Sequence, residues 1–109
     1  MRIWDIAPKK LCRNHLLGEH RELHAIWSVL TKNKRGYSRH PETLRWKGKL
    51  HALYLRHEKL VQEMRARGWQ HHSALNAKLA TGARRQRHFI DHPAQQITIL
   101  KNKKCACRV

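Results

Sequence analysis

Acidic residues are scarce in this chain of 109 residues. Seven Asp and Glu oppose 24 Lys and Arg, which gives a formal net charge of +17 before any of the ten histidines is protonated. The basic residues run through the whole chain instead of forming a tail, and this pattern predicts a polyanionic partner, with nucleic acid as the first choice. Charge alone fits a ribosomal or architectural protein equally well, so it says nothing about chemistry.

Cysteines and long apolar runs are also lacking. The chain has three cysteines, an odd number, with two of them in a Cys-x-Cys pair, and this does not indicate a disulfide framework. No run approaches the roughly 20 apolar residues that span a bilayer, and the start MRIWDIAPKK lacks the apolar core of a secretory signal. We therefore expect a cytoplasmic protein in a reducing compartment, without a membrane partner.

Recognisable metal and nucleotide motifs are missing as well. The sequence has neither a P-loop nor an HExxH motif. Cys105 and Cys107 form half of a zinc site at best, because such sites need four ligands and usually space paired cysteines by two to four residues. We expect a frayed tail there, a solvated turn at His71-His72 and a packed small residue at Cys12. The sequence thus predicts no metal and no cofactor.

Helical periodicity is present, and strand alternation is not. Between Pro8 and Leu30 only Gly18 interrupts a helical pattern, and a second helix is expected from Pro41 to the C′ residue Gly68. Residues 73–80 predict a short third helix capped by Ser73, and Asp91 is expected to cap a last one before Pro93. The fold class predicted is all-α: one compact domain over residues 1–109, with two long helices and one or two short ones. Tryptophans are expected to anchor its core: Trp4, Trp27, Trp46 and Trp69.

The first expected helix carries a carboxylate at the edge of its apolar face. Leu16, Leu23 and Trp27 recur at helical spacing. Advancing about 100° per residue from Leu16 puts Glu22 on the flank of the core, and His15 is nearly in line with it two turns earlier. Taken alone, this arrangement favours a surface salt bridge between Glu22 and a Lys or Arg.

Two blocks of the sequence resemble a known enzyme family. The chain starts M1-R2-I3 and continues N14-H15-L16-L17-G18-E19-H20-R21-E22-L23, and later has K49-L50 with A52-L53, then E63-M64 and R67-G68-W69. These residues resemble the pyrimidine-dimer DNA glycosylase/AP lyase family of the phage endonuclease V type, most clearly over residues 1–69. The chain departs from the family at His20, where an aromatic ring is usual, at Ala25, and in its C-terminus, which lacks the family's aromatic residues.

The resemblance implies a DNA-repair enzyme whose terminal α-amine is the nucleophile. An α-amine has an ordinary pKa of roughly 7.7 to 8.0, and nearby cations lower it further. The resemblance implies Met1 and Glu22 as catalytic residues, with Met1 expected to be retained because Arg2 is large. It implies DNA contacts by four residues: Arg2, Asn14, His15 and Arg21.

The expected substrate is damaged double-stranded DNA, bound by a monomer without metal or cofactor. The lesion stays open between pyrimidine dimers, abasic sites and other damaged bases. Two alternatives also stay open. One is a basic DNA-binding protein without activity on the same scaffold, and the other is a metal-dependent nuclease that uses the histidines.

Overall fold

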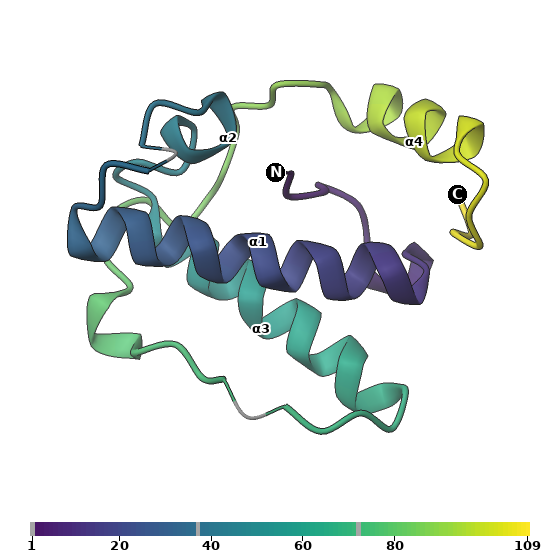
Figure 1. The fold of residues 1–109 in the computed structure, drawn as a ribbon, viewed down its shortest axis with the longest axis horizontal. Coiled ribbons are helices and arrows are strands. Elements are labelled where there is room, and N and C mark those ends of the chain that lie inside the picture. Colours follow the sequence, from purple (N-terminus) through teal and green to yellow (C-terminus); the bar gives the residue numbers. More distant parts are fainter. Residues whose placement is uncertain (1, 37, 72) are drawn as a thin grey trace.

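The computed structural model describes residues 2–36, 38–71 and 73–109, and within these ranges it is helical and contains no strand. This confirms the predicted all-α class. The helices are α1 (Arg13–Lys32), α2 (Pro41–Leu44), α3 (Leu50–Ala66) and α4 (Pro93–Asn102), with 3₁₀ turns η1 (Pro8–Lys10) and η2 (Ala77–Leu79). Figure 1 shows α1 and α3 crossing at the centre of the molecule, with α4 beyond the N-terminal segment.

The core lies between α1 and α3. Leu16, Leu23 and Ile26 of α1 and Leu53 and Leu60 of α3 are fully buried. Burying each of these side chains contributes roughly 1.5–3 kcal/mol, so this interface supplies a large part of the stability. The helical spacing predicted the buried face of α1 correctly.

Tryptophans complete this core, as the sequence predicted. Trp4, Trp27 and Trp46 are at most 6% exposed, and Trp69 is half-buried and packs against the same cluster. The core therefore joins the N-terminal segment, α1 and the turn after α2 into one body.

The predicted second helix is broken in two, and the single long helix from Pro41 was wrong. Helix α2 ends at Leu44, the backbone turns through Gly48 (φ 74°), and α3 begins at Leu50. The break turns the Arg45 side chain into the core and leaves Leu44 49% exposed. Gly68 follows α3 with φ 82°, as expected of a C′ glycine.

The two short helices differ from prediction in their caps. Residues 73–80 contain only the 3₁₀ turn η2, which Asn76 caps instead of Ser73. At α4 the side chain of His92 is the cap, and Asp91 forms an ion pair with Arg2 instead. In both places a residue one to three positions further along satisfies the free backbone N–H groups of the helix start.

The segment after η2 covers the start of α3. The backbone N–H of His51 donates to the Thr81 carbonyl at 2.8 Å, and that of Ala52 donates to the Ala83 carbonyl at 3.0 Å. Gly82 (φ 84°) lies so close to the Gly48 carbonyl that a Cβ atom would clash with it. A glycine is therefore required at position 82 for this capping segment to approach α3.

The C-terminal region folds back beside the start of the chain (Figure 1). Leu100 of α4 is buried, and the backbone N–H of Arg108 donates to the Lys10 carbonyl at 2.7 Å. The expected frayed tail at Cys105 and Cys107 is therefore wrong. No helix in the described ranges is both long and apolar enough to cross a membrane.

Candidate active site and two side-chain clusters

A buried carboxylate of α1 holds the N-terminal segment. The backbone N–H of Trp4 donates to Glu19 Oε1 at 3.0 Å. Arg56 of α3 donates to both oxygens of the same carboxylate, from Nε at 2.7 Å and from Nη2 at 3.0 Å. Burial raises the pKa of Glu19 above its ordinary value, whereas Arg56 and the Trp4 amide favour the ionised form. Glu19 thus fastens residue 4 to the middle of α1.

A buried arginine holds the same segment from the other side. Arg45 Nη2 donates to the Ile3 carbonyl at 3.0 Å and to Asp5 Oδ2 at 3.0 Å. Its Nε donates to Glu42 Oε1 at 2.7 Å, so the buried guanidinium is neutralised by two carboxylates. A buried charge is tolerated only with such partners, and the break after α2 places the Arg45 guanidinium beside both carboxylates.

The region around α4 supplies a third set of contacts. Gln96 is buried, accepts the Asp5 backbone N–H at 2.8 Å and donates to Asp5 Oδ2 at 3.0 Å. Asp91 pairs with Arg2 at 2.9 Å. A cavity of about 280 Å³ opens between these residues and α2. Residues 2–5 are therefore fixed by side chains from α1, α2 with its following turn, and α4.

Glu22 differs from every other acid of the chain. Five of the seven Asp and Glu form an ion pair with an Arg, and Glu58 Oε1 lies 3.0 Å from His57 Nδ1. Within the described residues Glu22 has no ion-pair partner, although it is half-buried on α1 in a strongly basic protein. The expected salt bridge between Glu22 and a Lys or Arg is therefore not formed within the described residues. The five acids paired with an Arg are Asp5, Glu19, Glu42, Glu63 and Asp91.

The other predicted site residues lie at different places around this segment. Arg2 stacks its guanidinium over the Trp4 ring at 4.9 Å while pairing with Asp91. Asn14 and Arg21 are exposed and lie seven residues apart on α1, so they share one face. Met1 lies outside the described residues.

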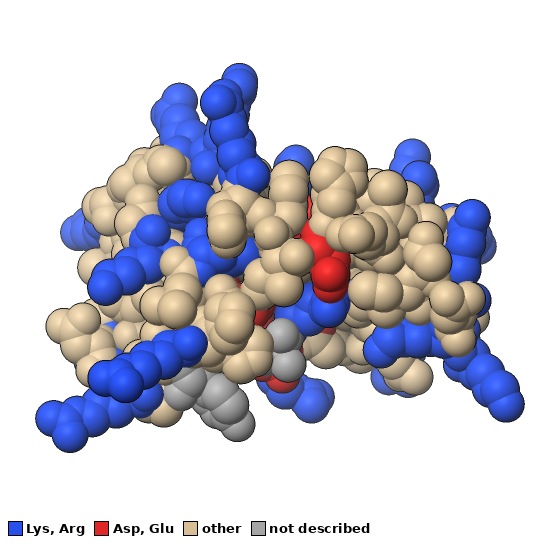
Figure 2. Space-filling model, turned by 90° about the horizontal axis from the view of Figure 1, so that it is seen from above, with Lys and Arg blue, Asp and Glu red and all other residues tan. Residues whose placement is uncertain are grey.

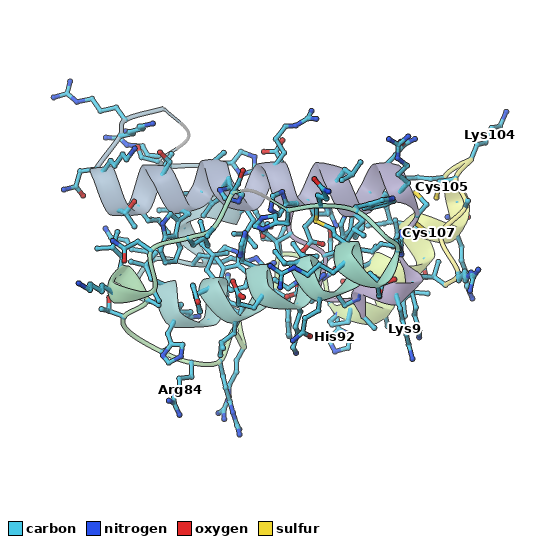
Figure 3. The ribbon with its side chains drawn as sticks, turned by 90° about the horizontal axis from the view of Figure 1, so that it is seen from below. Lys9, Arg84, His92, Lys104, Cys105 and Cys107 are labelled. Atoms are coloured by element: carbon cyan, nitrogen blue, oxygen red, sulfur yellow. The ribbon has the colours of Figure 1, made fainter. Side chains whose placement is uncertain are left out.

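His15 lies among all three cysteines of the chain. Its Nδ1 is 3.1 Å from Cys12 Sγ and 3.2 Å from Cys107 Sγ. With Cys105 they form the thiol cluster, in which one potential ligand atom from each residue lies within 4.8 Å of every other. Figure 3 shows Cys105 and Cys107 on the C-terminal tail, at the end of the molecule where α1 begins. Cys12 was expected to be only a packed small residue, whereas the structure places its sulfur beside a histidine ring nitrogen.

Four histidines form a second group, the histidine cluster, between α1, α3 and the segment after α3. His20, His24, His57 and His71 each offer a ring nitrogen within 4.8 Å of the others. Burial and the neighbouring rings lower the pKa of His20 to about 4, and they lower the pKa of His24 as well. The expected solvated turn is therefore wrong at His71, while His72 lies outside the described residues.

Sequence reasoning missed both clusters, although a weak signal was present. Cys12 and His15 are spaced i, i+3, and His20 and His24 are spaced i, i+4, so each pair lies on one helix face. The remaining ligands come from distant segments, which no spacing rule connects. Only the fold brings the C-terminal tail to Cys12.

The surface is basic over most of the described chain. Most Lys and Arg are exposed, whereas Arg45 is buried and four others are half-buried: Arg2, Lys49, Arg56 and Arg67. Figure 2 shows blue side chains around the rim of one face, with a small red group near its centre. This distribution suits a polyanion that contacts the cations of the rim.

The comparisons with known proteins agree with this arrangement. A profile of the pyrimidine dimer DNA glycosylase family matches residues 1–77, which include the N-terminal segment, α1, α2 and α3. Searches of curated proteins and of solved structures found no match.

Proposed function

Because the chain belongs to the pyrimidine dimer DNA glycosylase family, we propose that it is a bifunctional glycosylase and AP lyase acting through its terminal α-amine. Membership of this family supports a DNA glycosylase function in general. The proposal adds the nucleophile, the second reaction and the residues that perform them.

The reaction begins with the neutral α-amine of Met1. Its nitrogen attacks C1′ of the damaged nucleotide, and the glycosidic bond breaks with its electron pair leaving on the base. Loss of the amine proton and opening of the sugar ring give an iminium between nitrogen and C1′. The iminium acidifies the C2′ proton, whose removal expels the 3′ phosphate by β-elimination. Water then hydrolyses the imine and releases the enzyme.

Glu22 acts at two of these steps. Its carboxylate stabilises the positive charge that develops on the sugar as the base departs. It then accepts the proton from C2′, as a general base within reach of the sugar. A carboxylate already paired with an arginine would do neither well, and Glu22 has no ion-pair partner among the described residues.

The contact between the Trp4 amide and Glu19 carries the proposal. Glu19 and Glu22 are one helical turn apart on α1, a rise of about 4.5 Å. Trp4 is three positions after Met1, and a chain of that length reaches at most about 11 Å. The anchored segment is therefore long enough for the α-amine to reach the Glu22 carboxylate. The hydrogen bonds of Ile3 and Asp5 limit the positions that the start of the chain can take, and this favours an amine close to Glu22.

The proposed DNA contacts are polar and basic side chains near this point: Asn14 and Arg21 are exposed, and Arg2 is partly buried in its ion pair with Asp91. Arg2, Asn14 and Arg21 are proposed to hold phosphates beside the lesion, and His15 is proposed to contact the sugar through its Nε2. To reach C1′ the enzyme must distort the duplex and extrude a base, which costs a few kcal/mol and least at damaged steps. Phosphate contacts offset this cost and make binding depend strongly on salt.

Borohydride trapping tests the proposal. The full-length protein is incubated with duplexes that carry an abasic site or UV photoproducts, the imine is reduced, and the adduct is mapped by peptide mass spectrometry. We expect a covalent adduct on the peptide that starts at Met1. A protein that binds both duplexes without an adduct or cleavage would instead be the inactive DNA-binding protein, and a map to a lysine would contradict the α-amine.

An extension at the N-terminus gives an independent prediction. One extra residue before Met1 displaces the amine from the anchored segment, so we expect trapping on abasic DNA to fall by about 10²-fold, the loss associated with misplacing a reacting group. DNA binding, measured by fluorescence anisotropy, should stay within about twofold. Undiminished trapping in the extended protein would point to a side-chain amine.

A further inference from the structure

We propose that the thiol cluster, Cys12, His15, Cys105 and Cys107, binds one zinc ion that fastens the C-terminal tail to the start of α1. Three cysteines and one histidine are a common ligand set of structural zinc sites, and such sites are tetrahedral. The four residues come from two segments at least 90 positions apart, and all three cysteines of the chain are among them.

The distances suit a tetrahedral ion. With Zn–S near 2.3 Å and Zn–N near 2.0 Å, ligand atoms around zinc are separated by about 3.5–3.8 Å. His15 Nδ1 lies 3.1 Å from Cys12 Sγ and 3.2 Å from Cys107 Sγ, and no pair of the four ligand atoms exceeds 4.8 Å. Shifts of a few tenths of an ångström for the closest pairs, and about 1 Å for the widest, would give an ion four ligands.

Hydrogen bonding alone does not account for the contacts of His15. A ring nitrogen carries either one proton or one lone pair in the plane of the imidazole, so it makes one well-directed hydrogen bond. Nδ1 of His15 has two sulfur atoms within 3.2 Å. A shared metal ion would satisfy the nitrogen and both sulfurs together. The ring would then carry its proton on Nε2, which remains available to donate to DNA.

A backbone donor points at one of the sulfurs. The backbone N–H of Cys12 points at Cys107 Sγ, with nitrogen and sulfur 3.1 Å apart, and such a donor stabilises negative charge on sulfur. Zinc binding would release the three thiol protons and leave a site of net charge −1. A chain of formal charge +17, with Lys103 near His15, tolerates that charge readily.

Cobalt substitution tests this site. The purified full-length protein is reduced, stripped of metal and titrated with Co²⁺, which adopts zinc geometry and reports its ligands in the absorption spectrum. We expect one equivalent to give a sulfur-to-cobalt charge-transfer band in the near ultraviolet and intense visible bands of tetrahedral cobalt. Zinc should then displace the cobalt and bleach both features.

The variants identify the ligands. Cys107→Ser should lose the charge-transfer band at one equivalent of cobalt, whereas Ala106→Ser, between the two tail cysteines, should keep it. Wild-type protein that shows no charge-transfer band under reducing conditions would overturn the proposal without any variant. A band that survives in Cys107→Ser with its intensity unchanged would overturn it as well.

A separate observation leads us to infer a second metal ion in the histidine cluster. The Nε2 atoms of His24 and His20 are 3.2 Å apart, those of His20 and His71 are 2.9 Å apart, and those of His24 and His57 are 3.1 Å apart. His20 and His24 each make two such contacts with a nitrogen that has one in-plane site. One divalent ion ligated by four Nε2 atoms resolves this, with nitrogens about 3.3 Å apart at a Zn–N distance near 2.0 Å.

The hydrogen bond between His57 Nδ1 and Glu58 resembles the one by which metal-binding histidines are oriented. Glu58 Oε1 lies 3.0 Å from His57 Nδ1, and His57 is fully buried. A carboxylate that accepts the Nδ1 proton fixes the tautomer in which Nε2 presents its lone pair, and metal-bound histidines are usually oriented in this way. Imidazole ligands suit zinc, copper and nickel, and we take zinc as the probe.

Metal content separates the two sites. After zinc reconstitution and gel filtration, elemental analysis should find two equivalents in the wild-type protein and one in Cys107→Ser. His71→Gln in the Cys107→Ser protein should remove the remaining equivalent, whereas His88→Gln, an exposed histidine outside the cluster, should not. A Cys107→Ser protein that retains no zinc would overturn the histidine site, and this readout is independent of any misfolding caused by substituting His71.

Discussion

Residues 1–77 and residues 78–109 differ in what the comparisons recognise and in what they contribute. The first region matches the family profile and carries Glu22, Arg21 and Asn14 on α1. The second lies outside that match, yet its α4 and its tail contact the N-terminal part of the chain through Gln96 and Arg108. The recognised region thus carries the proposed chemistry, and the other one holds it in place.

This difference shows why a family profile can end before the functional unit does. Several contacts of residues 78–109 with the start of the chain are polar and depend on one side chain each: Asp91 on Arg2, Gln96 on Asp5 and Cys107 on Cys12. Such contacts leave no periodic pattern in the sequence. They can be replaced by others in a relative while the first region keeps its residues.

The largest effect should come from the first region. Glu22→Gln removes the charge that stabilises the sugar cation and the base that accepts the C2′ proton. We expect cleavage of abasic DNA to fall by about 10²- to 10⁴-fold, with binding within about threefold. Single-turnover cleavage and fluorescence anisotropy measure the two quantities.

Glu63→Gln is the matched control for Glu22→Gln. It makes the same chemical change in an acid that pairs with Arg67 near the end of α3 and is only partly buried. Its cleavage rate should stay within about twofold of wild type. A Glu22→Gln enzyme that cleaves as well as this control would remove Glu22 from the mechanism.

A smaller effect should follow from loosening the second region. Gln96→Leu deprives the Asp5 amide of its acceptor and removes one donor to its carboxylate, a loss of about 1–3 kcal/mol in the free energy of unfolding. The N-terminal segment would then sample more positions, and we expect trapping on abasic DNA to slow by about 10- to 100-fold.

Thr98→Ala controls for a general weakening of α4. Thr98 is exposed, and its hydroxyl donates to the Ala94 carbonyl within the helix. We expect near-wild-type trapping and melting temperature from this variant. If Gln96→Leu lowers the melting temperature but leaves trapping untouched, residues 78–109 stabilise the fold without positioning the amine.

Sequence reasoning succeeded where the structure follows local rules. The buried face of α1 and the C′ position of Gly68 depend on periodicity and backbone preference, both of which can be read within a few residues. The break between α2 and α3 could not be read in this way. It depends on burying Arg45 against Ile3 and Asp5, about 40 positions away.

The residues of the candidate site also fall into those that a local motif predicts and those that depend on the fold. The family motif pointed to Glu22, Arg21 and Asn14 on one helix, because the motif is itself local. The two residues that anchor the N-terminal segment most directly, Glu19 and Gln96, received no role from the sequence. Their function exists only because the chain folds residues 2–5 between α1 and α4.

The smallest expected effect is on the salt dependence of DNA binding, and it tests which face of the molecule contacts DNA. Each phosphate contact contributes about −0.9 to the slope of log K against log salt concentration. Arg21→Gln, on the exposed face of α1, should therefore reduce this slope by about 1. Arg84→Gln should leave it unchanged, because Figure 3 places Arg84 on the face away from α1. Both variants remove one exposed guanidinium, so their net charge is equal and only the position differs. Equal changes in slope would mean that DNA binding follows net charge and that the duplex does not dock over α1.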